Sequence, residues 1–371
     1  MTDTAKVSLD ILKAYIFGKE YTDEISEQKA SAAFALLEKH DLGHIAGIVL
    51  QNRFDNEKLV QIQFTAAMRY ETMNYEFERV CAVFEKHKIP YFPLKGAVIR
   101  AWYPEPWHRT SADIDILVEE KNLDKAAEAV INDLSYTRNT LKGDHDLQMF
   151  APNGVHFELH FDLKRDGIAT NEAIKTAVPV TEYQYSFTPE MFVLLHIAHM
   201  AKHFQMGGCG IRPLLDIVFM NRNLKYDKEK LDKLLVKNGL KKFADSMFEL
   251  SEVWFGNRET NKFYDSLSEY IIGAGVYGTL QNGVLVGHAR ENGRFKYILG
   301  RIFLKRDSLK YLYPSVEKHP CLLPFFEVAR WINLLKPDRI GKAKKEFAIN
   351  NSVNETQQDF VANLLDSLEL N

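Results

Sequence analysis

Two carboxylates one residue apart, Asp113 and Asp115, stand in the short apolar run Asp113–Val118. Such a run is typical of a β-strand, in which successive side chains point to opposite faces of the sheet. Asp113 and Asp115 then share one face, while Ile114 and Ile116 point into a core on the other. Two carboxylates held side by side repel each other unless a cation lies between them, and a bound divalent metal is the usual solution.

A turn that could hold phosphate lies shortly before this strand, at Lys95-Gly96. A glycine turn followed by a helix offers backbone N–H groups to a phosphate, and residues 97–102 can form a short helix. A metal site beside a phosphate site indicates nucleotide chemistry. A loop that carries His108, Arg109 and Ser111 joins this turn to the strand.

A third carboxylate, Glu158, lies on the most regularly alternating segment of the chain, Val155–Leu163. Its apolar residues share one face, and the other face carries His156, Glu158, His160 and Asp162. Three carboxylates from two adjacent strands can hold two Mg²⁺ ions, one of which lowers the pKa of an attacking hydroxyl while the other steadies a leaving pyrophosphate. The alternatives are a metal-free Asp-x-Asp on the surface and, for Glu158, the solvated face of an edge strand.

The segments around these residues predict a small mixed α/β core over residues 71–165. It is completed by four further elements: an extended segment Ile89–Leu94, a helix Leu123–Leu134, and strands at Tyr136–Leu141 and Asp146–Phe150. Residues 1–70 and 166–371 form helical regions on either side. The predicted fold class is therefore α+β, a small mixed β-sheet flanked by an N-terminal and a C-terminal helical region.

Apolar residues at helical spacing predict the longer helices of these regions. The predicted spans are Gln61–Lys88, Pro189–Phe204, Arg212–Asn221, Asp227–Phe255, Asn261–Ile272 and Gly293–Lys305. A capping box at Ser352–Glu355 predicts the start of a last amphipathic helix, Glu355–Leu370.

The composition of the 371-residue chain is that of an ordinary globular protein, with 46% hydrophobic and 26% charged residues. The net charge of −3 gives no general attraction to nucleic acid or to a membrane surface. Three widely spaced cysteines indicate neither a disulfide framework nor a zinc knuckle. The polar N-terminus is unlike a secretory signal, and no apolar run is long enough to span a membrane. We therefore expect a cytoplasmic location.

Histidines His196, His199 and His203 fall on one face of the predicted helix Pro189–Phe204. Packing histidines, contacts with a nucleotide or an acceptor, and a zinc site are the three interpretations, and zinc is the weakest because no cysteine or carboxylate completes a ligand pattern. His160 shares the face of Glu158 and is the better site candidate. Arg212 and Asp216 stand one helical turn apart, which predicts a structural ion pair.

The core motifs resemble a known family. They are Leu94-Lys95-Gly96-Ala97, the loop Tyr103–Pro106, Arg109-x-x-x-Asp113-Ile114-Asp115 and Glu158-Leu159-His160. This set resembles a bacterial nucleotidyltransferase-like family usually described as uncharacterised, within the DNA polymerase β-like nucleotidyltransferase superfamily. The resemblance extends over residues 10–340, and the Asp-x-Asp block with its upstream Lys-Gly is its most specific part.

The resemblance implies transfer of a nucleoside monophosphate from an NTP to an acceptor, with Mg²⁺ or Mn²⁺ as the cofactor. Asp113 and Asp115 would bind both metals, and Glu158 would bind the catalytic metal and help to deprotonate the acceptor. The implied phosphate contacts are Lys95, the Gly96 backbone, Arg109 and Ser111, and the candidates for an acceptor or nucleotide contact are His160 and His199.

Two further functions remain open at this stage. Ala97 stands where the superfamily usually has a hydroxyl or a second glycine, and Glu158 stands where it often has aspartate; both favour a catalytically weak nucleotide-binding or protein-interaction module. A metal-dependent phosphohydrolase could use the same carboxylates. For a transferase, the charge balance favours a small molecule or a protein side chain over nucleic acid as the acceptor.

Overall fold

The computed structural model describes residues 1–370 except positions 55, 140–142, 144, 277, 292, 305, 307, 308, 310–312, 314 and 335. Its contacts divide the chain into two compact units. The first contains residues 1–202 and 210–276, and the second contains residues 203–209 and 277–371. Both predicted domain boundaries, after residues 70 and 165, fall inside the first unit, and the three-region division stays a prediction.

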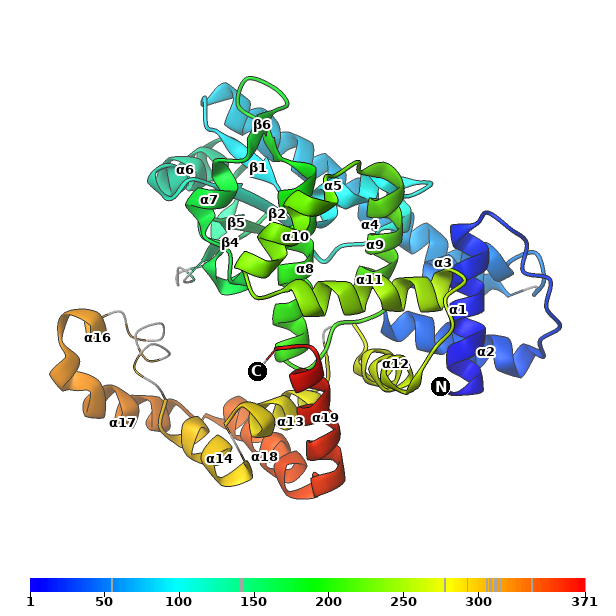
Figure 1. Ribbon diagram of the computed structural model, residues 1–371. Coiled ribbons are helices and arrows are strands. Elements are labelled where there is room, and N and C mark those ends of the chain that lie inside the picture. The colour runs from blue at the N-terminus through cyan, green and yellow to red at the C-terminus, as the bar shows by residue number, and fades with distance from the viewer. Residues whose placement is uncertain are drawn as a thin grey trace. The chain divides into compact units, whose positions relative to one another are not determined.

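The first unit is built around a five-stranded mixed sheet, which confirms the predicted α+β fold (Figure 1). The strands are β1 (Tyr91–Pro93), β2 (Asp113–Val118), β3 (Thr137–Arg138), β4 (Asp146–Phe150) and β5 (His156–His160), in the spatial order β1-β2-β5-β4-β3. Strands β2 and β5 are parallel, and the other pairs are antiparallel. The predicted strand Tyr136–Leu141 is thus shorter than expected, and its last two positions lie outside the described residues.

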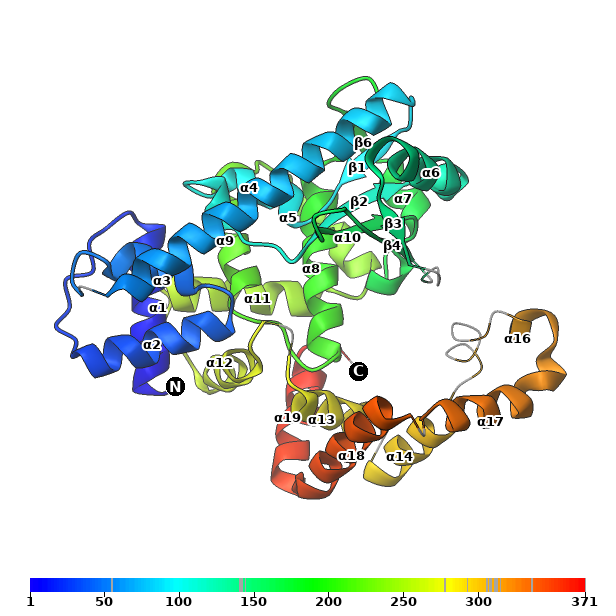
Figure 2. The same ribbon diagram turned by 180° about the vertical axis from the view of Figure 1, so that it is seen from behind.

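One face of this sheet is closed by the 30-residue helix α4 (Glu57–Lys86) and by α6 (Leu123–Leu134). Val80 and Phe84 of α4 join Ile114 and Ile116 of β2 in a single buried cluster. Figure 2 shows both helices on this side, whereas α8 (Pro189–Gln205) lies on the other side, in front of the strands in Figure 1. Because strand residues alternate, burying Ile114 and Ile116 turns the two aspartates to the opposite face.

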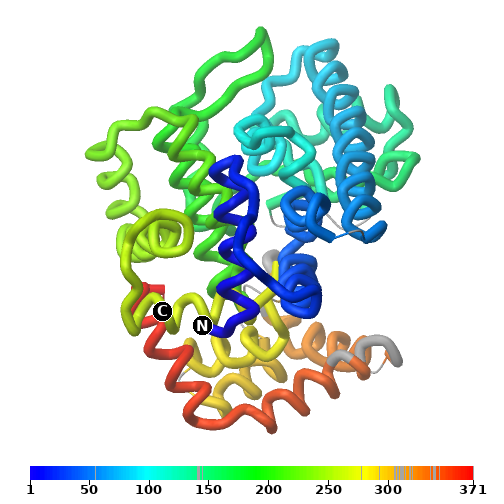
Figure 3. Tube along the Cα trace, turned by 90° about the vertical axis from the view of Figure 1, so that its right-hand side faces the viewer, coloured from blue at the N-terminus to red at the C-terminus, as the bar shows by residue number. Residues whose placement is uncertain are grey.

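Helices that precede and follow the strands along the chain complete the first unit. The N-terminal helices are α1 (Asp3–Ile16), α2 (Glu27–Lys39) and α3 (Gly43–Leu50), and α1 contacts α11 (Lys241–Phe255) (Figure 3). The elements between and after these are α5 (Gly96–Ile99), α7 (Thr170–Ile174), the hairpin β6 (Ala177–Pro179) and β7 (Tyr185–Phe187), α9 (Arg212–Asn223), α10 (Lys228–Lys237) and α12 (Lys262–Ala274). Thr2 and Ser26 cap α1 and α2 by accepting a hydrogen bond from a first-turn N–H.

The second unit is helical in its described part. It contains α13 (Leu280–Arg290), α14 (Arg294–Ile302), α16 (Ser315–Lys318), α17 (Leu323–Leu334), α18 (Pro337–Ser352) and α19 (Glu355–Ser367). The predicted capping box is two residues out of place: Asn354, rather than Ser352, caps α19, and Gln357 completes the box. Among the described helices, none is long and apolar enough to cross a membrane.

The predicted helix Asp227–Phe255 is wrong as a single element. The structure has α10 and α11 in its place, with a break at Asn238–Leu240. Gly239 has a φ of 66°, the left-handed conformation that glycine adopts without steric cost, so it ends α10 and turns the chain. The alternating segment Val155–Leu163 also forms a shorter strand than predicted, because β5 pairs only over His156–His160.

His40 joins helices that are far apart in the sequence. It is fully buried, its Nδ1 accepts a hydrogen bond from the N–H of Ile211, and its Nε2 bonds to the carbonyl of Ile272 at 3.0 Å. Burial lowers the pKa of His40 to about 4, so the imidazole is neutral in the folded protein.

This burial predicts an acid-sensitive fold. Because the folded pKa of His40 lies below its unfolded value of about 6.5, the unfolded chain binds more protons between these values. The contribution of neutral, buried His40 to the free energy of unfolding is therefore complete above pH 6.5. It is lost as the pH falls toward 4, by up to about 3 kcal/mol. Urea unfolding at several pH values should show a steeper acid loss for the wild type than for His40→Gln; equal slopes would contradict this.

Candidate metal and phosphate site

The parallel pairing of β2 with β5 builds the candidate site. In this register Asp113 lies opposite His156, and Asp115 lies opposite Glu158. All four side chains therefore point to the face away from α4, while Phe157 of β5 is buried in the apolar cluster on the other face. The three carboxylates named from the sequence are thus brought together by two strands that are about forty residues apart in the chain.

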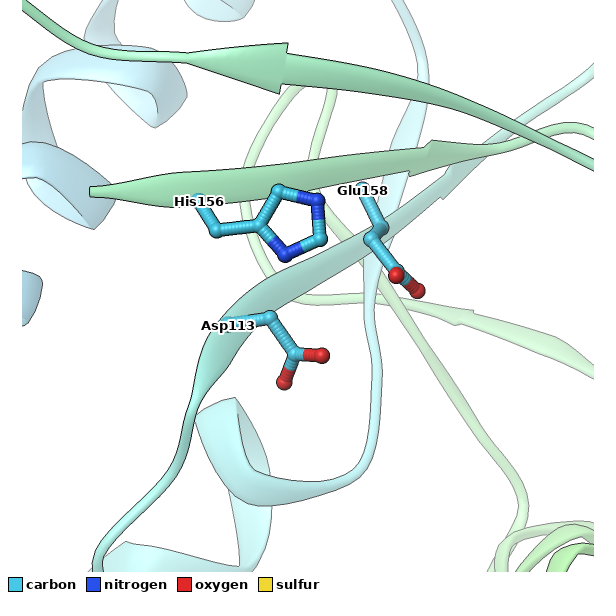
Figure 4. Close-up of side chains that lie close together, drawn as sticks. All are labelled: Asp113, His156 and Glu158. Atoms are coloured by element: carbon cyan, nitrogen blue, oxygen red, sulfur yellow. The ribbon is translucent and has the colours of Figure 1, made fainter. Parts of the chain in front are cut away.

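Two groups of three side chains have the spacing of a metal site. Asp113, His156 and Glu158 each offer a ligand atom, and these atoms lie within 4.8 Å of one another (Figure 4). Asp115, Glu158 and His160 form the second group at the same spacing, so Glu158 belongs to both. Carboxylate oxygens and imidazole nitrogens are common ligands of divalent metal ions. The side chains present therefore fit a divalent metal.

The carboxylate of Asp115 already has two cationic neighbours. Lys95 donates a hydrogen bond from Nζ to its Oδ1 at 2.7 Å, and Nε2 of His160 lies 2.7 Å from the same oxygen. Although burial opposes ionisation, the Lys95 ammonium and the His160 hydrogen bond hold the pKa of Asp115 well below its usual range. In turn, against the effect of burial, hydrogen bonds to Asp115 and Glu158 raise the pKa of His160. Asp115 is therefore a compensated anion.

Asp113 has the opposite environment. Within the described part of the chain, no residue forms a hydrogen bond or an ion pair with its carboxylate. Burial, together with the negative charge of Asp115, raises the pKa of Asp113 to about 6, and Lys95 only partly offsets this effect. An anion in this position gains most from a further positive charge.

The turn before β2 places Lys95. Its backbone has a φ of 47°, which is uncommon for any residue with a Cβ and is found where the surrounding structure enforces it. The next residue is Gly96, and a Cβ there would overlap Oγ of Ser111, so a larger residue would have to displace that hydroxyl. Lys95, Gly96 and Ser111 are thus packed together at the edge of the carboxylate cluster. Their roles in phosphate binding stay predictions.

Arg109 is held by a partner that the sequence did not indicate. Its guanidinium forms two hydrogen bonds with buried Asp216, at 2.8 and 2.9 Å, and Tyr103 donates a third to the same carboxylate. Arg212 instead pairs with Asp41 at 2.7 Å. The predicted ion pair between Arg212 and Asp216 is therefore wrong. Helical spacing permits a contact between Arg212 and Asp216, but Asp216 pairs instead with Arg109, which is distant in the sequence.

The histidines of α8 have separate environments. His196 bonds to the carbonyl of Pro213, and Nδ1 of His199 lies 3.6 Å from Asp166. Lys202 also pairs with Asp166, at 3.0 Å. His203 belongs to the second unit, and none of the metal-spaced groups found in the described residues includes a histidine of this helix. The contact of His199 with a nucleotide or an acceptor stays a prediction.

His156 is the residue that the sequence reasoning missed. It appeared there only as a member of the polar face of its strand. Its signal was the alternation itself, since a residue two positions before Glu158 on a strand must share the face of that carboxylate. What could not be read was the register, which sets His156 opposite Asp113.

The first unit thus presents a mixed sheet with carboxylates at the spacing of a metal site, beside a lysine turn. A family described as an uncharacterised nucleotidyltransferase matches residues 29–256. The chain therefore belongs to this family of nucleotidyltransferases. No curated protein matches the chain. The matched residues include the whole sheet and every side chain of the two metal-spaced groups.

The Arg109–Asp216 pair predicts a structural role for this arginine. Removing one partner of a buried pair leaves an uncompensated charge, so Arg109→Met and Asp216→Leu should each lower the free energy of unfolding by about 3–5 kcal/mol. The double variant should lose at least about 1 kcal/mol less than the sum of the two. Denaturant unfolding measures all three. A stable Arg109→Met variant with weakened NTP binding would instead favour direct phosphate contact.

Proposed function

We propose that this protein is a divalent-metal-dependent nucleotidyltransferase that moves a nucleoside monophosphate from an NTP to a small molecule or a protein side chain. The observation that carries the proposal is the placement of Asp113, Asp115 and Glu158 on one face of two paired strands, in a chain that belongs to a nucleotidyltransferase family. Mg²⁺ or Mn²⁺ is the proposed cofactor, and the net charge of −3 disfavours a nucleic-acid acceptor.

Each side chain of the cluster has its own role in this proposal. Asp113, Asp115 and Glu158 would hold the metal ions, which when bound supply charge to activate the acceptor hydroxyl and to stabilise the pyrophosphate. The pKa of Glu158 lies below its ordinary value: burial opposes this, but the His160 hydrogen bond and the charges of His160 and Lys95 together outweigh it. Glu158 is therefore a carboxylate at neutral pH and can accept the acceptor's proton. His160 orients both Asp115 and Glu158.

Lys95 is proposed to hold the triphosphate with the backbone of Gly96. Its side chain is partly exposed while it is bonded to Asp115, so it could exchange this partner for a phosphate oxygen once the charge of that carboxylate is balanced by a bound metal. Ser111 lies against Gly96 and is proposed as a further phosphate contact. We propose that Arg109 acts indirectly, by fixing the loop that carries Ser111. His199 remains a proposed contact for the nucleotide or the acceptor.

A second function has one observation in its favour. Lys95 and His160 already neutralise Asp115, which would suit a module that binds nucleotide and turns it over weakly. The reaction products distinguish the candidates. Release of pyrophosphate supports transfer, release of inorganic phosphate supports a phosphohydrolase, and NTP binding without turnover across a panel of acceptors supports the module.

Asp113→Asn is the sharpest test of the proposed site. It removes one charge that faces the metal while keeping the shape of the side chain, so metal-dependent NTP turnover should fall by about 100-fold or more. Pyrophosphate release from labelled NTP measures the effect, and far-UV circular dichroism checks the fold. Asp124→Asn, at an exposed position of α6, is the matched control and should keep full activity. Unchanged turnover in Asp113→Asn would place the chemistry elsewhere.

A further inference from the structure

His156 occupies a position beside Asp113 that packing alone does not explain. It stands opposite Asp113 in the β2–β5 register, and its side chain points to the same side of the strands as Asp113 and Glu158 (Figure 4). Its Nε2 is buried and has no hydrogen-bond partner among the described residues. A buried ring nitrogen without a partner calls for an explanation, and Figure 4 shows the other ring nitrogen, Nδ1, turned toward Asp113.

The ring of His156 is also fixed in place. It stacks on Phe150 of the neighbouring strand β4, with the ring centroids 4.9 Å apart and the planes 20° from parallel. This stack restricts the rotation of the imidazole, whose side chain lies on the same side of the strands as the carboxylates. A ligand that is oriented in advance by its neighbours is the usual arrangement at metal sites.

The charges of the cluster are distributed unevenly. Lys95 and His160 both contact Asp115, at 2.7 Å each, whereas no cationic group within the described residues contacts Asp113. The group around Asp113 thus has two carboxylates and an imidazole. His160 lies 3.3 Å from Glu158, but Asp113 has no cationic contact among the described residues. A dication bound there would supply the positive charge that Asp113 lacks, with the imidazole of His156 as a further ligand.

We propose that His156 is a metal ligand, and that the Asp113–His156–Glu158 group binds a transition-metal dication such as Mn²⁺ in preference to Mg²⁺. Mg²⁺ favours oxygen ligands and gives up its water reluctantly, while imidazole nitrogen suits transition metals. The inference rests on the proposed function for the location of the metal site. It adds the identity of a ligand and the class of metal.

The test is metal binding to the full chain in the absence of NTP. Titration with Mn²⁺, followed by the electron paramagnetic resonance signal of the free ion, gives the affinity, and competition with Mg²⁺ gives the preference. The wild type should bind Mn²⁺ at least about tenfold more tightly than Mg²⁺. His156→Phe keeps a ring to stack on Phe150 but offers no ligand, and should weaken Mn²⁺ binding by about 10- to 100-fold while leaving Mg²⁺ binding nearly unchanged.

Two further variants make the test specific. His156→Asp offers oxygen in place of nitrogen and should shift the preference toward Mg²⁺. Phe150→Leu keeps the ligand but removes the stack that orients it, so it should weaken Mn²⁺ binding less than His156→Phe does. Thermal unfolding without metal confirms that each variant is folded. Pulsed paramagnetic resonance should show ¹⁴N coupling to bound Mn²⁺ in the wild type and lose it in His156→Phe.

Equal Mn²⁺ affinity in the wild type and His156→Phe, ¹⁴N coupling that persists in that variant, or equal binding of Mg²⁺ and Mn²⁺ by the wild type would each overturn the inference. Failure of the proposed function looks different. In that case the wild type shows the Mn²⁺ preference and its loss in His156→Phe, but transfers no nucleotide with either metal.

Discussion

The parallel pairing of β2 with β5 is the constraint on which the candidate site depends. It sets Asp115 beside Glu158 and Asp113 beside His156, and it does so because the opposite faces of both strands are buried under α4 and α6. A slip of one residue in either strand would turn its carboxylates into the apolar core and its apolar side chains into the site. The hydrophobic core therefore specifies the site as firmly as it specifies the fold.

Three carboxylates on one face repel one another, and the protein compensates this repulsion at Asp115 but not at Asp113. Lys95 reaches Asp115 from a turn with a left-handed backbone, and His160 reaches the same oxygen from β5. Asp113 receives no such contact from the described residues. Burial and the charge of Asp115 therefore raise its pKa. The charge of Asp115 is balanced by the protein itself, so the cluster can form without a metal. The charge of Asp113 is left unbalanced, which favours binding of a cation there. This is the physical reason to regard the cluster as a binding site.

Local patterns in the sequence were sufficient for the elements but not for their long-range partners. The short apolar run predicted β2 as Asp113–Val118, and helical spacing predicted α6 as Leu123–Leu134, both as observed. The shared face of Asp113 and Asp115 followed from the alternation of side chains along a strand. The Arg109–Asp216 pair joins residues 107 positions apart, and no local pattern contains that information. The position of His156 opposite Asp113 depends on the strand register. Shifting one strand by two or four residues keeps the same side chains on the same face, so alternation does not determine which register forms. Gly239, by contrast, was a readable helix end within Asp227–Phe255.

We propose that the face formed by β2 and β5 binds the metal and the nucleotide together. A crystal structure of the full chain with a divalent metal and a non-hydrolysable NTP analogue tests it most directly. We expect metal density in contact with Asp113, Asp115 and Glu158, and a triphosphate that lies against the Lys95–Gly96 turn. Metal bound elsewhere, or a nucleotide that does not touch this face, would contradict it.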